Sequence, residues 1–433
     1  MKFKALALVA MFASASPITA AEVQQHTMDN GLNVLLIEAH HVPMVAMQLV
    51  MPAGSRFDAD GKGGSAMLLA SMLTDHTKKA DHQAWAAKLD DAAIQLSAGA
   101  DQDAMSVSLT VLSEALDEGV SAMAEALLMP GWDKKRFDFI KTNAVSGATR
   151  AQEDATTHAG LAAAEILFPN HPYGHLVGGS LQSLPAISLG DVKTLYAAQI
   201  KPVGATLAVS GDITMPELLK VLNTHLNPWS GKPKQALADI EQAKPTAKME
   251  ENITLDKNQV LVQWMRLGLS RHDPLYMDAL VLNHMLGGGG FGSRLMEEIR
   301  EKRGLVYGVY SWFQPLETAG AYTIRLQTRA DQAGQAEEVL QQVLQSLANG
   351  EISQDELDKS KVNLMGGFAQ RMDSNRERAG LLAMMGLYHK PLNYLENWTK
   401  SIESVTLASV KLVAALYLQP QLWHRIRVGP AKP

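Results

Sequence analysis

Residues 287–313 combine a glycine-rich segment with an arginine and a tyrosine seven residues apart, in the stretch GGGGFGSRLMEEIREKRGLVYGVYSWF. A glycine-rich loop before a helix can hold phosphate on free N–H groups. A nucleotide loop, however, requires the GxxxxGK[ST] spacing, or a strand directly before GxGxxG, and this segment has neither. We therefore predict a tight, mobile connection formed by Gly287, Gly288, Gly289 and Gly290.

The arginine and the tyrosine, Arg300 and Tyr307, belong to the elements that follow the glycines. Residues 293–303 are predicted to form a helix that ends at Gly304. Its pattern gives three buried apolar residues and one i,i+4 ion pair: Leu295, Met296, Ile299 and the pair Glu298–Lys302. Tyr307 is expected to enter a strand, 305–313, on the face of Val309 and Ser311. Taken alone, these positions favour a surface ion pair for Arg300 and a half-buried position for Tyr307.

The histidines do not have the spacing of a metal site. His171 and His175 lie in HPYGH, where proline and glycine prevent the helix that would place both imidazoles on one face. His76 and His82 flank two lysines, and zinc needs three or four convergent ligands. We predict turn or surface positions for all four. The sequence also contains no GxSxG motif, so it gives no support for a serine-hydrolase elbow.

Strands and helices alternate in a similar order in the two halves of the chain, as judged from hydrophobic periodicity. The predicted strands are two within 31–54 joined by a turn at 40–43, then 105–112, 205–213, 258–269, 305–313, 320–328 and 425–429. The predicted helices are 63–73, 81–96, 113–128, 133–152, 155–167, 188–199, 215–225, 274–286, 293–303, 330–348, 353–370 and 374–388.

A polar segment without periodicity, 229–249, is predicted to link the two halves. The halves themselves, 22–228 and 250–433, each have a size typical of one large domain. We therefore predict an α+β fold with two homologous α/β-sandwich domains, each a mixed, mostly antiparallel sheet flanked by helices.

The first 21 residues are typical of a secretory signal peptide, with Lys2 and Lys4 before an apolar run and small residues at the end. The run is shorter than the ~20 residues that span a bilayer, so no stable membrane anchor is expected. We predict a periplasmic or secreted protein. The net charge of -6 is spread along the chain, which argues against nucleic-acid binding.

Several motifs together resemble the insulinase/pitrilysin metallopeptidase family, in the branch of mitochondrial processing peptidase and its bacterial relatives. They are REKRGLVYGVYS (300–311), LFPNHPYG (167–174), VSGDI (209–213) and the repeated halves. The resemblance implies a clam-shell arrangement of the two domains. It also implies a zinc motif, HxxEH, on the first-domain helix, where two histidines bind Zn²⁺ and the glutamate is the general base.

The positions that correspond to this zinc site carry no side chain that binds zinc or acts as a base. Aligned with the family pattern, Met67 and Ser71 stand at the histidines, Ala70 at the general base and Gly147 at the third ligand. None of these side chains can replace an imidazole or a carboxylate on zinc. The resemblance thus implies that this chain binds no metal or other cofactor and has no catalytic residue of its own.

Arg300 and Tyr307, in contrast, match a family pair that reaches toward the substrate, and their donors can stabilise a peptide oxyanion. The resemblance implies a non-catalytic subunit that binds peptides together with a zinc-bearing homologous partner, with Zn²⁺ in the partner. One alternative is a peptide-binding or scaffolding homodimer that uses strand addition. Another is a hydrolase with Ser71 as nucleophile, for which no base stands at a recognisable spacing.

Overall fold

The computed structural model describes residues 22–430, so the predicted signal peptide lies outside the described residues. The first sheet has six strands in the order β1-β2-β6-β3-β5-β4. They are β1 (Gln24–Thr27), β2 (Asn33–Glu38), β3 (Met44–Met51), β4 (Gln95–Ala100), β5 (Met105–Leu112) and β6 (Thr206–Gly211). The helices of this half are α1 (Ser65–Asp75), α2 (His82–Asp91), α3 (Leu116–Leu128), α4 (Lys134–Ala151), α5 (Ala155–Leu167), α6 (Ser183–Ala186), α7 (Leu189–Gln199) and α8 (Met215–Leu226).

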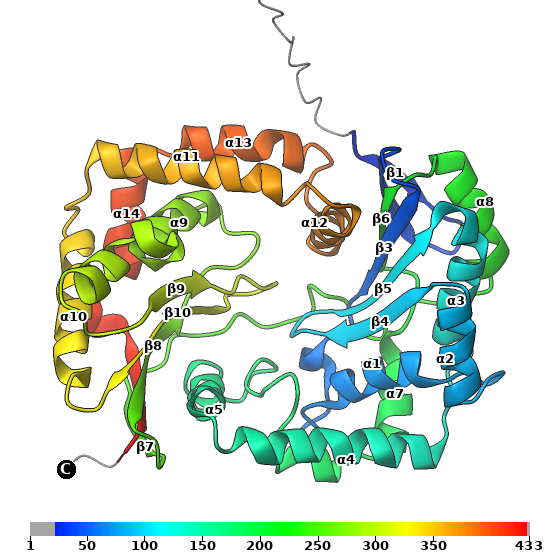
Figure 1. Cartoon of the computed structure of the whole chain (residues 1–433), viewed down its shortest axis with the longest axis horizontal. Coiled ribbons are helices and arrows are strands. Elements are labelled where there is room, and N and C mark those ends of the chain that lie inside the picture. The colour runs from blue at the N-terminus through cyan, green and yellow to red at the C-terminus, as the bar shows by residue number, and fades with distance from the viewer. Residues whose placement is uncertain (1–21, 431–433) are drawn as a thin grey trace, which may run out of the picture.

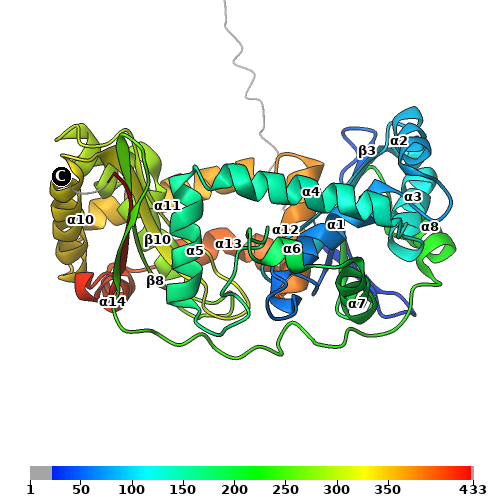
Figure 2. The same ribbon diagram turned by 90° about the horizontal axis from the view of Figure 1, so that it is seen from below.

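The second sheet has five strands in the order β7-β11-β8-β10-β9. They are β7 (Glu250–Thr254), β8 (Gln259–Leu267), β9 (Val309–Phe313), β10 (Ala321–Arg329) and β11 (His424–Gly429). The helices are α9 (Tyr276–Asn283), α10 (Ala333–Ala348), α11 (Gln354–Gln370), α12 (Asn375–Leu387), α13 (Tyr394–Ser404) and α14 (Leu407–Tyr417). Residues 229–249, which connect the sheets, contain no helix or strand and run along one side of the molecule (Figure 2).

The two sheets have the same topology, which confirms the predicted duplication. The order β2-β6-β3-β5-β4 in the first sheet corresponds to β7-β11-β8-β10-β9 in the second. The directions also agree: β2–β6 and β7–β11 are parallel, and all other pairs are antiparallel. The predicted α+β fold with two mixed, mostly antiparallel sheets is therefore confirmed.

The two halves exchange a helix. In Figure 1, α12 and α5 lie between the sheets. Helix α12 packs on β2, β3 and β6 of the first sheet, and α5 packs on β8 and β11 of the second. Two apolar clusters join residues of both halves in this way, one around Leu382 and Ile37 and the other around Ile166 and Ile426. Because α12 covers the face of the first sheet opposite its own helices, the central strand β6 is buried along its whole length.

A buried carboxylate joins the halves at their centre. Asp103, which is fully buried, accepts hydrogen bonds from the hydroxyls of Tyr173 and Tyr388 and from the backbone N–H of Glu317. Arg56 lies beside it, with 3.5 Å between Nη1 and Oδ1, and also donates to the carbonyl of Leu237 in the connecting segment. These bonds fix the two sheets and the connection relative to one another.

Several elements differ from the prediction. The helix expected over 81–96 ends at Asp91, and residues 95–100 form β4. This strand has a glycine and no β-branched residue, so its own sequence favours it weakly and its ladder with β5 stabilises it. The prediction also missed β1, β7, α13 and α14. Among residues 22–430, no helix is long and apolar enough to cross a membrane.

Candidate functional site

The glycine-rich segment is more ordered than the predicted loop. Helix α9 continues as a π-helical turn, His284–Gly288, and only then does the chain turn at Gly290, which has a φ of 60°. Gly287 is buried, and a Cβ there would lie 2.6 Å from the Oγ of Ser311 in β9. Gly287 therefore allows a helix to approach the sheet closely, and it belongs to the helix end, not to an open loop.

The helix predicted over 293–303 contains a π-helical segment, Met296–Glu301, with a backbone bond of 2.9 Å from Lys302 N–H to Glu297 O. Such widened turns often occur at functional sites. The predicted buried residues are buried, the Glu298–Lys302 pair forms at 2.7 Å, and Gly304 ends the helix with a φ of 63°. The predicted burial, ion pair and helix end are therefore confirmed, whereas the π-helical segment was not predicted.

Arg300 lies between two aromatic rings. Its guanidinium carbon is 4.6 Å from the centroid of Phe291 and 5.5 Å from that of Tyr307. The predicted surface ion pair is wrong, because no described carboxylate pairs with Arg300. Its helical neighbour Glu298 pairs instead with Lys302 and Arg303. Stacking between rings orients the cation and leaves its N–H groups free for a ligand.

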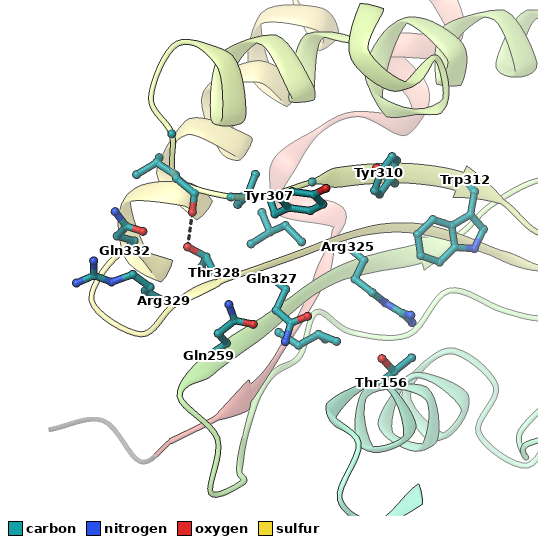
Figure 3. Close-up of a pocket in the computed structure, with 16 residues that line it drawn as sticks. Thr156, Gln259, Tyr307, Tyr310, Trp312, Arg325, Gln327, Thr328, Arg329 and Gln332 are labelled. Carbon is teal, nitrogen blue, oxygen red and sulfur yellow. Dashed lines mark hydrogen bonds between the residues drawn. The ribbon is translucent and has the colours of Figure 1, made fainter.

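Tyr307 is not in a strand. Strand β9 begins at Val309, and the Tyr307 side chain is 90% exposed, so the predicted half-buried position on the face of Val309 and Ser311 is wrong. The segment before β9 is held instead by the Thr328 hydroxyl, which donates to the carbonyl of Leu305 (Figure 3). Phe291, which sequence reasoning missed, could have been noticed as the one aromatic residue among the glycines.

Tyr307 lines a cleft of ≈ 880 Å³ over one face of the second sheet (Figure 3). The aromatic side chains of Tyr307, Tyr310 and Trp312 follow the direction of β9, and Arg325 and Arg329 come from β10. Thr156 of the exchanged helix α5 closes another side. The volume lies within the range of ordinary ligand sites, and the aromatic groups and the Arg325 guanidinium are suited to a peptide.

Strand β9 is an edge of the second sheet. Among residues 22–430, it hydrogen-bonds to β10 along one edge and has no partner strand along the other. The Val309 N–H of β9 donates to the Sδ of Met296 at 3.4 Å. The remaining backbone groups on this edge can pair with an extended peptide, whose side chains would then enter the neighbouring cleft. The site thus combines a free strand edge with the aromatic row and the stacked Arg300.

The positions that we predicted to correspond to zinc ligands lie on two helices that contact each other, α1 and α4. Met67 and Ser71 are partly exposed, whereas Ala70 is fully buried. No atom lies within 4 Å of a Cβ built on Gly147. Within the described part of the chain, no cluster of three or more histidine, cysteine, aspartate or glutamate side chains could hold a metal. The residues present do not fit zinc.

Ser71 does not have the surroundings of a nucleophile. Its hydroxyl donates to the Met67 carbonyl at 3.0 Å, one helical turn away. In the described structure, no histidine or carboxylate hydrogen-bonds to it, so no base could accept its proton. The absence of polar side chains at Met67 and Ala70 also lets the helix pack without a desolvation cost.

The histidines have structural environments. His171 is in a turn, as predicted, and its Nε2 lies 3.0 Å from the carbonyl of Glu241. His175 is half-buried, and burial lowers its pKa. His82 starts α2 and is partly exposed. The prediction was wrong for His76, which is 5% exposed because its ring packs against Gly131 before α4. Its Nδ1 lies 2.8 Å from Asp75, and its Nε2 accepts from the N–H of Asp133 at 3.3 Å.

Two family models match the chain. Residues 33–167 match the model described as insulinase (peptidase family M16), and residues 186–364 match the one described as peptidase M16 inactive domain. A crystal structure of a peptidase M16 inactive domain from Pseudomonas fluorescens is 30% identical, with a TM-score of 0.90 over 95% of this chain and 98% of that one.

Two relatives from Helicobacter pylori differ in the activity that their names state. The "non-peptidase homolog YmxG" is 25% identical and covers 93% of this chain and 92% of its own length. The "zinc protease PqqE" is 23% identical, with 82% of each chain covered. The inactive-domain matches and the first of these relatives confirm the prediction that this chain is not a peptidase by itself.

Proposed function

Because the chain belongs to the insulinase (M16) peptidase family, we propose that it is the non-catalytic subunit of a heterodimeric zinc peptidase. A homologous partner would bind Zn²⁺, and this chain would supply substrate-binding groups and a wall of the chamber. The observation that carries the proposal is an asymmetry. Tyr307 lines a cleft and Arg300 lies 5.5 Å from its ring, whereas Met67, Ser71 and Gly147 stand at the positions that align with the zinc ligands of the family.

The partner's presence is supported by the kinds of relatives found. Helicobacter pylori contains both a relative named as a non-peptidase homolog and one named as a zinc protease. A pair of homologous chains with divided roles would explain why a chain without zinc residues retains a substrate-binding pair. If the predicted signal peptide is cleaved, the proposed complex would lie in the periplasm or outside the cell, and N-terminal sequencing of the exported protein tests this.

The contribution of Arg300 and Tyr307 would be electrostatic. A guanidinium and a phenol hydroxyl both donate hydrogen bonds, and neither accepts a proton at neutral pH. Held against the carbonyl of a bound peptide, they would stabilise the negative charge that develops when water attacks it. Because Arg300 is stacked between Phe291 and Tyr307, less side-chain freedom is lost on binding.

Co-expression with a zinc-bearing homologue from the same genome tests the proposal. The purified pair should form a heterodimer that contains zinc and hydrolyses peptides. Arg300→Ala together with Tyr307→Phe should lower kcat/KM by about 10²-fold or more, as expected for lost oxyanion donors, without changing assembly. Arg303→Ala is the matched control, because Arg303 is on the same segment but pairs with Glu298. Unchanged turnover in the double variant would contradict the proposal.

A second candidate is a peptide-binding homodimer with no catalytic partner. The free edge of β9 favours it, since strand addition needs no chemistry. In that case the purified chain would form a stable homodimer, bind peptides alone and ignore the zinc homologue. Sedimentation of each chain alone and of the mixture distinguishes the two candidates.

A further inference from the structure

Arg325 occupies an unusual position in the cleft beneath β9. It lies on β10 directly opposite Tyr310, and its guanidinium carbon is 5.3 Å from the centroid of Trp312. Its Nε and Nη2 both donate to Oε1 of Gln263, at 2.9 and 2.6 Å. Gln263 is buried, so the guanidinium is held in one orientation by a neutral partner and an aromatic ring. Its remaining N–H groups are available to a ligand.

The charge of Arg325 is not neutralised by a contact. Within residues 22–430 no carboxylate forms an ion pair with it, and no aspartate or glutamate is among the described residues that line the cleft. Burial lowers the pKa of Arg325, and the charge of Asp154 opposes this shift. Asp154, however, caps α5 by accepting from the N–H of Thr156. A half-buried cation without a counter-ion is costly, and a bound anion would remove that cost.

Arg329 lines the same cleft but forms an ion pair within the protein. It comes from the same strand and points to the same face, but its Nε and Nη2 bond to Asp331 at 3.0 and 2.6 Å. Its side chain is 67% exposed. The two arginines therefore differ in one respect that matters for binding: Arg325 has a rigid, unpaired guanidinium inside the cleft, and Arg329 does not (Figure 3).

We propose that Arg325 and Trp312 form a subsite for a peptide carboxylate, so that the cleft selects peptides with an acidic side chain or a free C-terminus close to the segment bound along β9. This inference rests on the proposed peptide-binding function. The planar guanidinium can hold a carboxylate with two parallel hydrogen bonds, and the indole of Trp312 supports the same plane. Tyr310 and Tyr307 offer apolar surface to the neighbouring residues of the peptide.

Fluorescence anisotropy with three sets of acetylated alanine–serine octapeptides tests the subsite. One set carries a glutamate at successive positions and has an amidated C-terminus. The second has glutamine at the same positions, and the third has glutamine and a free C-terminal carboxylate. Binding is measured with the heterodimer and with this chain alone. The best glutamate or free-carboxylate peptide should bind about tenfold more tightly than its neutral counterpart, and added salt should reduce the difference.

Variants assign the preference to one side chain. Arg325→Gln should abolish the preference while the neutral peptides bind as before, because the new amide can still donate to Gln263. Arg325→Lys should keep part of it, since the charge remains but the two-pronged geometry is lost. The control Arg329→Gln should leave it unchanged. Circular dichroism and the melting temperature of each variant confirm that it is folded.

The outcomes separate this inference from the proposed function. Equal binding of charged and neutral peptides by the wild type would overturn the subsite while peptide binding stands. A preference that survives in Arg325→Gln, or disappears in Arg329→Gln, would overturn its assignment to Arg325. If no peptide binds to the chain or to the heterodimer, the proposed function fails and the subsite with it.

Discussion

Replacement of Asp103 by asparagine should weaken the connection between the two halves. The carboxylate is fully buried and accepts on both oxygens: Oδ1 from Tyr173 and Arg56, Oδ2 from Glu317 N–H and Tyr388. An amide has one accepting oxygen. Either orientation of asparagine therefore points an NH₂ group at two donors, and Arg56, whose side chain is 2% exposed, loses its counter-ion.

The expected loss can be estimated from these contacts. Hydrogen bonds to a charged group contribute about 1.5–3 kcal/mol each, and two are lost on one side of the amide. Removing one partner of a buried ion pair costs about 3–5 kcal/mol. This cost is reduced here, because Arg56 and Asp103 are 3.5 Å apart and Arg56 also donates to the carbonyl of Leu237. Because these effects overlap, we expect a decrease of about 3–5 kcal/mol in the free energy of unfolding.

Urea denaturation followed by tryptophan fluorescence measures this decrease. Tyr388→Phe, which removes a single donor from the second half, should cost about 1.5–3 kcal/mol. The double variant should cost less than the sum, because Asp103→Asn already removes the charged acceptor of the Tyr388 hydroxyl. Asp138→Asn is the matched control: this residue forms an exposed i,i+4 pair with Lys134, and its loss should change stability by less than about 0.5 kcal/mol.

A decrease below about 1 kcal/mol for Asp103→Asn would refute this reasoning, since it would mean that the buried carboxylate does not hold the halves together. Strict additivity of the Asp103 and Tyr388 variants would refute it as well, because residues in direct contact are expected to couple.

The remaining predictions concern packing, pH and the lost metal site. Gly386→Ala should destabilise the protein by about 1–3 kcal/mol, because a Cβ there would overlap Thr206 of β6. Gly367→Ala in α11 meets open space and should stabilise the protein by roughly 0.5–1 kcal/mol. Thermal unfolding of the two variants measures both changes. Burial alone would raise the pKa of Glu356, but hydrogen bonds from Arg294 and Ser353 lower it to about 2 from 4.5. The wild type should therefore exceed Glu356→Gln by about 1–2 kcal/mol above pH 4.5, and denaturation should show this advantage falling as pH decreases toward 2; a constant difference would contradict the assignment. Three substitutions restore ligand types at the degenerate zinc positions: Met67→His, Ser71→His and Gly147→Glu. The triple variant should bind one zinc ion per chain by mass spectrometry, and the two histidines without Gly147→Glu should bind far more weakly.

Local pattern was sufficient for many of the elements. The apolar spacing that predicted α3 and α5 describes helices with a buried face that recurs at each turn, and such a face is visible in a short window. The end of the Arg300 segment at Gly304 was also predictable, because a left-handed terminal residue favours glycine. Strand β4 was not predictable, since its small residues acquire their strand conformation from β5.

The candidate site was predictable only in part. Arg300 and Tyr307 could be named from their motif, but their stacking with Phe291 could not, because the turns at the glycines bring that ring back over the helix. Arg325 gave no signal at all. Its role depends on Gln263 and Trp312, which belong to two other strands, and on the absence of an acidic neighbour in the assembled cleft.

The sequence by itself determined the duplicated order of elements, because hydrophobic periodicity is visible within short windows. The lost zinc ligands and the matched pair Arg300 and Tyr307 are what its resemblance to the family implies. Only the tertiary structure decided how the halves meet. The exchange of α5 and α12, and the bond from Tyr388 to Asp103 across 285 positions, arise from residues that no short window contains together. The same holds for the cleft at β9, since three strands and a helix of the other half enclose it.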